Sequence, residues 1–249
     1  MPGSKVEVEK LTRALDGKVV LRDVSFLIEP GELVALTGPS GSGKTTLLQL
    51  LGGLDRPTSG RIMVDDIAVH ALRHPTRYRR EVVGFVFQLH HLLPALSAQE
   101  NVELPMVAAH VPRRERHERA RELLDEVGLL SRAASLPSSL SGGERQRIAI
   151  ARALAGQPRL ILADEPTGSL DALATERIWE LLASVRQRHG STILIASHDR
   201  GLLQHVERNL AIREGVVFEQ GLDANQSDPD AETPPPSGGD PHDHAPANA

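Results

Sequence analysis

The octapeptide Gly38-Pro-Ser-Gly-Ser-Gly-Lys-Thr45 is the stretch of sequence that decides the fold. It lies between Glu32–Thr37, which predicts a strand, and Thr46-Leu47-Leu48, which predicts a helix. Its glycines let the backbone curl so that successive N–H groups point at one anion, and the helix adds the positive end of its dipole. The pattern predicts a phosphate-binding loop rather than a turn without function. Lys44 is expected to reach the terminal phosphates, and the Thr45 hydroxyl to bind Mg²⁺. The expected members of the loop are Gly38, Pro39, Ser40, Gly41, Ser42, Gly43, Lys44, Thr45 and Thr46.

The chain around this loop alternates short apolar runs with longer helical patterns, which is typical of an α/β domain. Several apolar runs are continuous, as expected for strands covered on both faces of a sheet. The expected strands are Leu33–Leu36, Arg61–Val64, Val82–Phe87, Leu160–Ala163, Thr192–Ala196, and a hairpin of Asn209–Ile212 with Val216–Phe218 around Glu214-Gly215. The expected helices are Lys44–Leu51, Pro112–Val127, Glu144–Leu154 and Ala172–Arg188.

The segment from about Leu89 to Leu140 is mostly helical in pattern and contains no clear strand. We therefore expect a helical subdomain, approximately residues 89–155, inserted into the α/β core of one domain spanning residues 1–221. Residues 222–249 hold one large aliphatic side chain, Leu222. Its burial, at about 25 cal/mol per Å², cannot offset an ordering cost of about 1–2 kcal/mol per residue. We expect this acidic, Pro-rich tail to be disordered.

The composition excludes several classes of function. The chain has no Cys, which excludes disulfides, thiolate nucleophiles and Cys-ligated metal centres. Aromatic residues make up 2%, too few for the stacking platforms of single-stranded nucleic-acid binders. The net charge is −5, but six acidic residues and no Lys or Arg follow Gly221, so the remainder is near +1 and offers no net attraction for nucleic acid. Since no run of roughly 18 apolar residues could span a membrane, we expect a soluble, cytosolic chain.

Two carboxylates, Asp164 and Glu165, directly follow the apolar run Leu160–Ala163. α/β proteins place ligands at the carboxyl ends of their parallel strands. There the pair suits Mg²⁺ coordination by Asp164 and activation of water by Glu165. The alternative is two solvated acids at a strand end, but a phosphate loop in the same chain favours a site.

The heptapeptide Leu140-Ser-Gly-Gly-Glu-Arg-Gln146 opens a predicted helix. Ser141 and Glu144 have the spacing of a capping box. Gly142 and Gly143 in the first turn cost roughly 1 kcal/mol each relative to alanine, which is unusual unless a ligand approaches the backbone closely. Because N–H groups at a helix start attract anions, this segment is a second candidate phosphate contact.

Five motifs taken together resemble the ATPase subunits of ABC transporters. In chain order they are the phosphate loop, Phe87-Gln88, Leu-Ser-Gly-Gly-Glu-Arg-Gln-Arg at 140–147, Ala-Asp-Glu-Pro-Thr-Gly-Ser-Leu-Asp at 163–171, and Ser197-His198-Asp199. The resemblance covers about residues 5–220. It implies a P-loop NTPase core, a RecA-like mixed sheet with an antiparallel β edge, and the inserted helical subdomain. It also implies ATP and Mg²⁺ at the site, and ATP hydrolysis coupled to transport.

The resemblance further implies that two copies pair head to tail. ATP held by Lys44 of one copy would be covered by Ser141, Gly142 and Gly143 of the other. Asp171 would cross the dimer interface.

For the reaction itself, the resemblance implies three further roles. Gln88 would link Mg²⁺ and the attacking water to a membrane partner. Glu165 would be the general base, and His198 would contact the γ-phosphate.

One position departs from the family pattern. Family members usually carry an aromatic residue, often Tyr, that stacks on adenine, and the register with Glu9-Lys10-Leu11-Thr12-Arg13 puts Leu15 there. Leucine packs on a base without the stacking that is worth about 1–3 kcal/mol for aromatic side chains. We therefore expect weaker nucleotide binding or a weaker base preference.

The segments Gln88–Pro94, Glu100–Pro105 and Leu51–Gly60 are similar to the branch that includes lipoprotein-releasing and macrolide-efflux ATPases. That branch drives separate membrane subunits, so the resemblance implies an integral membrane permease as partner and a location at the cytoplasmic face of the membrane. His90 and His91 are expected in a docking groove for the permease rather than in a metal site, because no third ligand accompanies them. Division-associated and other export ATPases share most of these motifs and stay as an alternative.

Other classes of ATPase fit the sequence less well. Chromosome-maintenance and DNA-repair ATPases carry long coiled coils between the phosphate loop and this signature, whereas no sustained heptads separate Lys44 from Leu140. A translation-associated ABC protein would carry two ATPase halves in one chain. A regulatory binding module would be expected to lack Lys44 or Glu165, and both are present.

Overall fold

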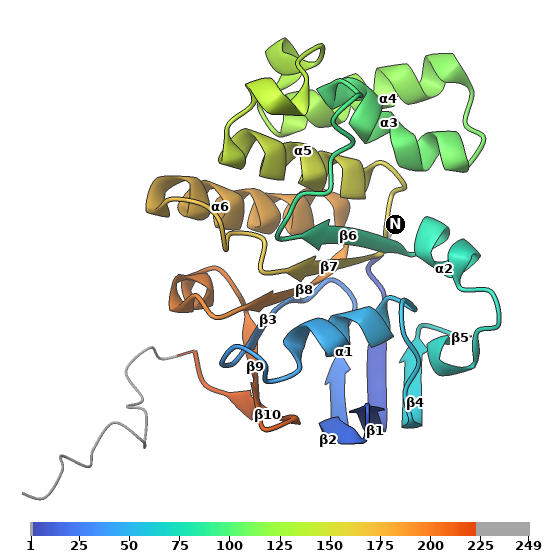
Figure 1. Cartoon of the computed structure of the whole chain (residues 1–249). Coiled ribbons are helices and arrows are strands. Elements are labelled where there is room, and N and C mark those ends of the chain that lie inside the picture. The colour runs from blue at the N-terminus through green and yellow to red at the C-terminus, as the bar shows by residue number, and fades with distance from the viewer. Residues whose placement is uncertain (1, 223–249) are drawn as a thin grey trace, which may run out of the picture.

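The computed structural model describes residues 2–222, which fold around two β-sheets (Figure 1). The larger sheet has the strand order β10-β9-β3-β8-β7-β6. Its neighbouring strands are parallel except for β10, which pairs antiparallel with β9. The predicted mixed α/β sheet with an antiparallel edge is therefore confirmed. Its strands are β3 (Leu33–Thr37), β6 (Val83–Phe87), β7 (Leu160–Asp164), β8 (Thr192–Ser197), β9 (Arg208–Arg213) and β10 (Val216–Gln220).

The smaller sheet is antiparallel, with the order β2-β1-β4-β5. It consists of β1 (Val6–Leu15), β2 (Lys18–Ile28), β4 (Ser59–Val64) and β5 (Ile67–Ala68). The sequence analysis did not predict β1, β2 or β5. Charged residues interrupt the apolar ones along β1 and β2, and the register between these strands shifts at Val8/Leu11, Leu11/Arg13 and Arg13/Ala14. Such shifts break the two-residue alternation by which a strand is recognised.

The helices are α1 (Lys44–Leu51), α2 (Thr76–Glu81), α3 (Ala98–Ala108), α4 (Arg113–Glu126), α5 (Gly142–Leu154) and α6 (Ala172–His189). Single turns of 3₁₀-helix occur at Val69–Ala71, Leu130–Arg132, Pro137–Ser139 and Arg200–Gln204. Four helices, α1, α4, α5 and α6, agree with the predicted ranges, whereas no bounds were predicted for α2 and α3. No helix within residues 2–222 has the length and apolar character needed to cross a membrane.

Both faces of the larger sheet are covered, which explains its continuous apolar strands. In β3, Val34 and Leu36 pack with α1 and the smaller sheet, whereas Leu33 and Ala35 pack with α5 and α6. Figure 1 shows α1 on one side of this sheet and α5 and α6 on the other. This sandwich aligns the carboxyl ends of β3, β7 and β8 along one edge of the sheet.

The predicted helical subdomain is present. Residues 88–159, between β6 and β7, contain no strand, and α3, α4 and α5 pack against one another at the top of Figure 1. Leu123 and Leu124 of α4 are fully buried in the core that α5 and α6 share. The predicted disordered tail lies outside the described residues except for Leu222.

The N-terminal segment is tied into the larger sheet. Ser4 N–H donates to Arg159 O at 3.1 Å, and Ser4 O accepts from Thr192 Oγ1 at 2.6 Å. Gly3 is buried, and a Cβ added there would lie 2.5 Å from Gly31 N. Gly3 and Ser4 therefore lie inside the fold, whereas Pro2 is exposed.

Candidate functional site

The loop between β3 and α1 follows a backbone path that requires glycine. Gly41 has φ 77°, and Gly43, the N-cap of α1, has φ 109°. A Cβ on Gly38 would overlap the carbonyl oxygen of Ile212 in β9. Only glycine fits these positions without strain or a clash. The loop therefore packs directly against β9, and it leads into the N-terminus of α1.

The polar side chains of this loop point inward. The buried Lys44 side chain donates from Nζ to Gly38 O at 2.7 Å and to Pro39 O at 3.2 Å. Ser42 Oγ is buried and has no hydrogen-bond partner within residues 2–222. A buried hydroxyl without a partner is costly, and a phosphate oxygen would supply the missing acceptor. The loop therefore fits an anionic ligand.

Asp164 ends β7 directly opposite the start of α1. Its Oδ1 accepts a hydrogen bond from Thr45 Oγ1 at 3.1 Å. Burial raises the pKa of Asp164, as does the charge of Glu165, while the Thr45 hydrogen bond and Lys44 act in the lowering direction. A carboxylate and a hydroxyl oxygen side by side are hard ligands of the kind Mg²⁺ binds, so these residues fit that ion.

Glu165 is held between a cation and an imidazole. Its backbone has φ 45°, and its N–H donates to Ala196 O in β8 at 2.9 Å. Its carboxylate lies 3.4 Å from Lys44 Nζ through Oε1 and 2.9 Å from His198 Nδ1 through Oε2. Because β7 and β8 are parallel neighbours, the sheet itself brings Glu165 and His198 together. The arrangement places a potential base beside the phosphate loop.

Gln88 follows β6, and the pairing of Phe87 with Asp164 sets it beside the same strand end. A Cβ added at Gly168 would lie 2.8 Å from Gln88 Nε2, so the Gln88 amide rests on the Gly168 backbone. Gly168 N–H in turn donates to Glu165 O at 3.1 Å. The side chain of Gln88 therefore lies on the loop that follows Glu165.

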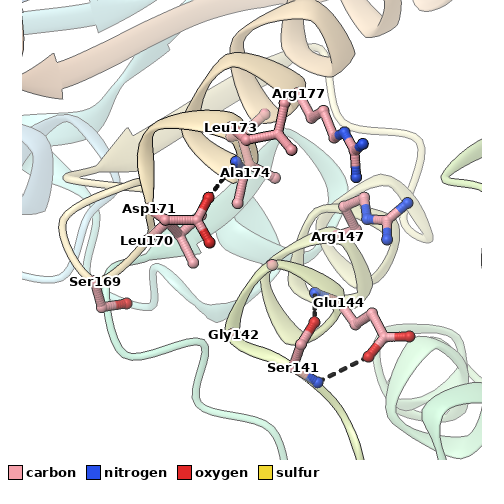
Figure 2. A pocket seen from close by; sticks show the side chains of 12 residues that line it. Ser141, Gly142, Glu144, Arg147, Ser169, Leu170, Asp171, Leu173, Ala174 and Arg177 are labelled. Atoms are coloured by element: carbon pink, nitrogen blue, oxygen red, sulfur yellow. Dashed lines mark hydrogen bonds between the residues drawn. The ribbon is translucent and has the colours of Figure 1, made fainter.

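The segment around Ser141 forms a second, separate site. Ser141 Oγ accepts from Glu144 N–H at 3.2 Å, and Glu144 Oε2 accepts from Ser141 N–H at 2.8 Å, which confirms the predicted capping box of α5. Asp171 caps α6 by accepting from Ala174 N–H at 2.8 Å. Figure 2 shows both helix starts facing one pocket of about 270 Å³, which Gly142 and Gly143 also line.

Two arginines that the sequence analysis did not name as site residues line this pocket. Arg147 from α5 and Arg177 from α6 both line it (Figure 2), and neither forms an ion pair within residues 2–222. Burial lowers the pKa of Arg147, the charge of Glu144 acts in the raising direction, and the charge of Arg177 adds to the lowering. Sequence spacing could not pair these residues, because only the packing of α5 on α6 brings them together. Glu144 and Asp171 line the pocket as well, so its lining carries charges of both signs.

The predicted site residues thus fall into three places. Lys44, Thr45, Asp164, Glu165 and His198 form one cluster, with Gln88 at its border. Ser141, Gly142, Gly143 and Asp171 line the pocket of Figure 2, which no residue of the phosphate loop lines. Leu15 stands apart at the end of β1, where it pairs with Lys18 and is 40% exposed.

Comparisons with known proteins identify the family of this chain. Residues 21–168 match the family described as ABC transporter. The chain is 43% identical, over 86% of its own length and 100% of the relative's, to the lipoprotein-releasing system ATP-binding protein LolD of Bacteroides fragilis (strain YCH46).

Two solved structures are similar to the fold. One is the dimeric structure of a post-hydrolysis state of the ATP-binding cassette MJ0796 bound to ADP and Pi, with TM-score 0.79 and 40% identity over 87% of this chain and 98% of that one. The other is cbiO1 from Clostridium perfringens, part of the ABC transporter complex cbiONQ, with TM-score 0.81 and 32% identity over 88% of each chain. With its phosphate loop, paired carboxylates and capped Ser-Gly-Gly helix in the matching order, the chain belongs to the ABC transporter family as an ATP-binding, ATP-hydrolysing subunit.

Proposed function

We propose that two copies of this chain bind ATP between them, head to tail, and drive a membrane permease of the lipoprotein-releasing type from the cytoplasmic face. The observation that carries the proposal is the separation, within one chain, of the Lys44 cluster from the pocket that Ser141 lines at the N-terminus of α5. A head-to-tail pair would bring the Ser141 pocket of one copy over the loop of the other. The likeness to LolD along that protein's whole length supports the lipoprotein-releasing branch.

Within that dimer, the chain's residues would act mainly by position and charge. Lys44 and the loop N–H groups bind the β- and γ-phosphates, while Ser141 and Gly143 of the partner copy bind the γ-phosphate from the other side. Glu165, 3.4 Å from Lys44, orients a water in line with the phosphorus and accepts its proton. His198 keeps the Glu165 carboxylate in place and contacts the γ-phosphate. Thr45, Asp164 and Gln88 would hold Mg²⁺, which supplies charge neutralisation on the phosphates.

Coupling to the permease would run through the segment after Gln88. Leu89 is 71% and Leu93 48% exposed, so this segment presents apolar side chains at the surface. An apolar surface of this kind fits an apolar helix of a membrane protein. Displacement of the segment by the permease would move Gln88 relative to Glu165.

A Glu165→Gln variant tests the catalytic assignment. General-base catalysis contributes about 10²–10⁴-fold, so turnover should fall by that factor while ATP still binds. With ATP and Mg²⁺ the variant should accumulate as a dimer in sedimentation velocity, whereas with ADP it should remain monomeric. Normal hydrolysis by this variant would remove Glu165 from the role of base.

The branch is tested by co-purification. The tagged Glu165→Gln chain is extracted with detergent from the membranes of its own cells in ATP, and its partners are identified by mass spectrometry. A permease with few membrane spans and a large extracytoplasmic domain is expected, and a Leu89→Asp variant should recover much less of it. Recovery of ribosomes or DNA-bound complexes in place of a permease would refute the proposal.

A further inference from the structure

The segment between Gln88 and Leu92 contains a double left-handed turn. His90 has φ 56° and His91 has φ 48°. Two successive non-glycine residues in this region are rare, because the Cβ approaches the carbonyl oxygen too closely. His91 N–H donates back to Leu89 O, which closes a tight turn. The surrounding structure must therefore hold this turn in place.

Arg152 of α5 supplies that support. Its Nη1 donates to His91 O and its Nη2 to His90 O, each at 2.6 Å. The planar guanidinium thus forms hydrogen bonds to the carbonyls of both left-handed residues. Arg152 forms no ion pair within residues 2–222, so these two carbonyls are the groups that its charge meets. Burial accordingly lowers the pKa of Arg152.

A second residue of α5 contacts Phe87, the residue directly before Gln88. Gln146, which is fully buried, donates from Nε2 to Phe87 O at 3.5 Å, and the His91 ring stands edge-on to Phe87 with centroids 5.1 Å apart. Contacts from α5 therefore bracket Gln88 on both sides, at Phe87 and at His90-His91. Gln88 itself rests on Gly168 and makes no hydrogen bond to α5 within the described residues.

We propose that Arg152 is a positioning residue for ATP hydrolysis: by gripping His90 O and His91 O it fixes the left-handed turn and so keeps Gln88 on the loop of Glu165. The inference rests on the proposed role of Gln88 in the reaction. Arg152 acts through the turn, by its hydrogen bonds to His90 O and His91 O. Arg152 also connects the turn to α5, whose N-terminal end carries Ser141. A displacement of the exposed Leu89 would therefore be transmitted to α5.

Arginine is the side chain that this role needs. Its fork presents two parallel N–H donors at fixed spacing, whereas the lysine ammonium is a point charge that cannot hold two carbonyls in one plane. Arg152→Lys should therefore retain charge and helix propensity but loosen the turn. Arg152→Ala should release it completely.

The first measurement is hydrogen exchange of the amides of residues 88–92 in the full-length chain. Arg152→Ala should raise their exchange rate about tenfold, and Arg152→Lys by less, because the left-handed turn loses its anchors. Arg121→Ala is the matched control, since Arg121 is an exposed arginine of the same helical subdomain without a hydrogen bond or ion pair within residues 2–222. If Arg152→Ala does not fold, Arg152→Lys alone decides this measurement.

The second measurement separates positioning from general stability. In steady-state ATPase assays Arg152→Ala should lower kcat about fivefold to tenfold with KM for ATP changed less than twofold. A pair of variants at His91 tests the turn itself, because they change the backbone preference of a residue whose carbonyl Arg152 binds. Both His91→Asn and His91→Val remove the imidazole, but Asn tolerates positive φ and the β-branched Val does not. His91→Val should therefore raise the exchange rate of residues 88–92 and lower kcat by the same factors as Arg152→Ala. His91→Asn should lower kcat less than twofold.

Unchanged exchange at residues 88–92 in the Arg152 variants would overturn the proposal, as would equal effects of Asn and Val at position 91. A separate Gln88→Ala variant distinguishes failure of the underlying role. If Gln88→Ala hydrolyses ATP normally, the role of Gln88 is wrong, and the kcat effect assigned to Arg152 falls with it. The exchange result still decides whether Arg152 holds the turn.

Discussion

At the residue scale, Leu15 is the position where the sequence departs from the family's usual aromatic. Its side chain is 40% exposed at the end of β1, so a larger ring would have room. Stacking of a base on an aromatic ring is worth about 1–3 kcal/mol. Leu15→Tyr should therefore tighten ATP binding about fivefold or more in an equilibrium titration. Val19→Tyr, at another exposed position across the same turn, is the control and should leave affinity unchanged. Equal affinities for wild type and Leu15→Tyr would place Leu15 outside the nucleotide site.

The same scale shows where sequence reasoning succeeds for the site. Lys44, Asp164, Glu165 and His198 lie at the ends of parallel strands or of the loop between strand and helix. The strand pattern pointed to the strand end of Asp164 and Glu165, whereas His198 was found through the family resemblance. Arg147, Arg177 and Arg152 could not be found in this way. Arg147 donates to Val127 O and Arg152 to His90 O and His91 O, so their partners are backbone carbonyls of other elements, which no residue type or spacing signals. Arg177 is on α6 and reaches the same pocket as Arg147 only through helix packing.

At the element scale, α3 and α5 carry the same capping box and offer a matched pair. Ser97 accepts from Glu100 N–H in α3 as Ser141 accepts from Glu144 N–H in α5. Loss of either hydroxyl should cost about 1 kcal/mol of unfolding free energy in urea denaturation. Ser141→Ala should in addition lower ATPase activity, whereas Ser97→Ala should not. An activity loss of equal size in both would show that Ser141 acts through helix stability alone.

The capping box of α5 also predicts a pH dependence. The hydrogen bond from Ser141 N–H, and secondarily the Ser141 hydroxyl and the charges of Arg132 and Arg147, hold the pKa of Glu144 below its usual value. A carboxyl with a lowered folded-state pKa stabilises the fold above its usual pKa, and this contribution is lost as pH falls through the folded-state value. Glu144→Gln keeps the cap without the charge. The stability difference between wild type and Glu144→Gln should be constant from pH 7 to about 5 and then shrink. A difference that does not shrink at all as the pH falls below 5 would contradict this origin.

β1 and β2 of the smaller sheet were harder to predict than the strands of the larger sheet for a physical reason. The strands of the larger sheet are buried on both faces and read as short apolar runs, so their positions follow from the sequence. β1 and β2 lie in the smaller sheet, and their pairing contains register shifts. The backbone of Lys10 and of Asp23 has positive φ in these strands, 46° and 48°. Helix α3 contains Pro105 in its interior, which argues against a helix on sequence grounds, yet its buried Val102 and Met106 hold it in the core.

At the scale of the whole molecule, the head-to-tail proposal predicts complementation. A Lys44→Ala chain keeps its Ser141 pocket, and a Gly143→Asp chain keeps its phosphate loop. Each should be inactive alone, but a mixed dimer would contain one intact composite site. An equal mixture should therefore recover about a quarter of wild-type ATPase activity, since half of randomly formed dimers are mixed and each has one of two sites. Inactivity of the mixture, with mixed dimers shown by mass spectrometry, would rule out a shared site.

The anchored N-terminus has a practical consequence for all of these measurements. Ser4 is hydrogen-bonded to Arg159, which directly precedes β7, and to Thr192 of β8. The position of Gly3 leaves no space for a side chain. An affinity tag fused ahead of the first residue would be separated by only two residues from that buried stretch, which contacts the amino ends of β7 and β8. Purification handles for pull-down and kinetics therefore belong beyond residue 222, where the chain leaves the last strand.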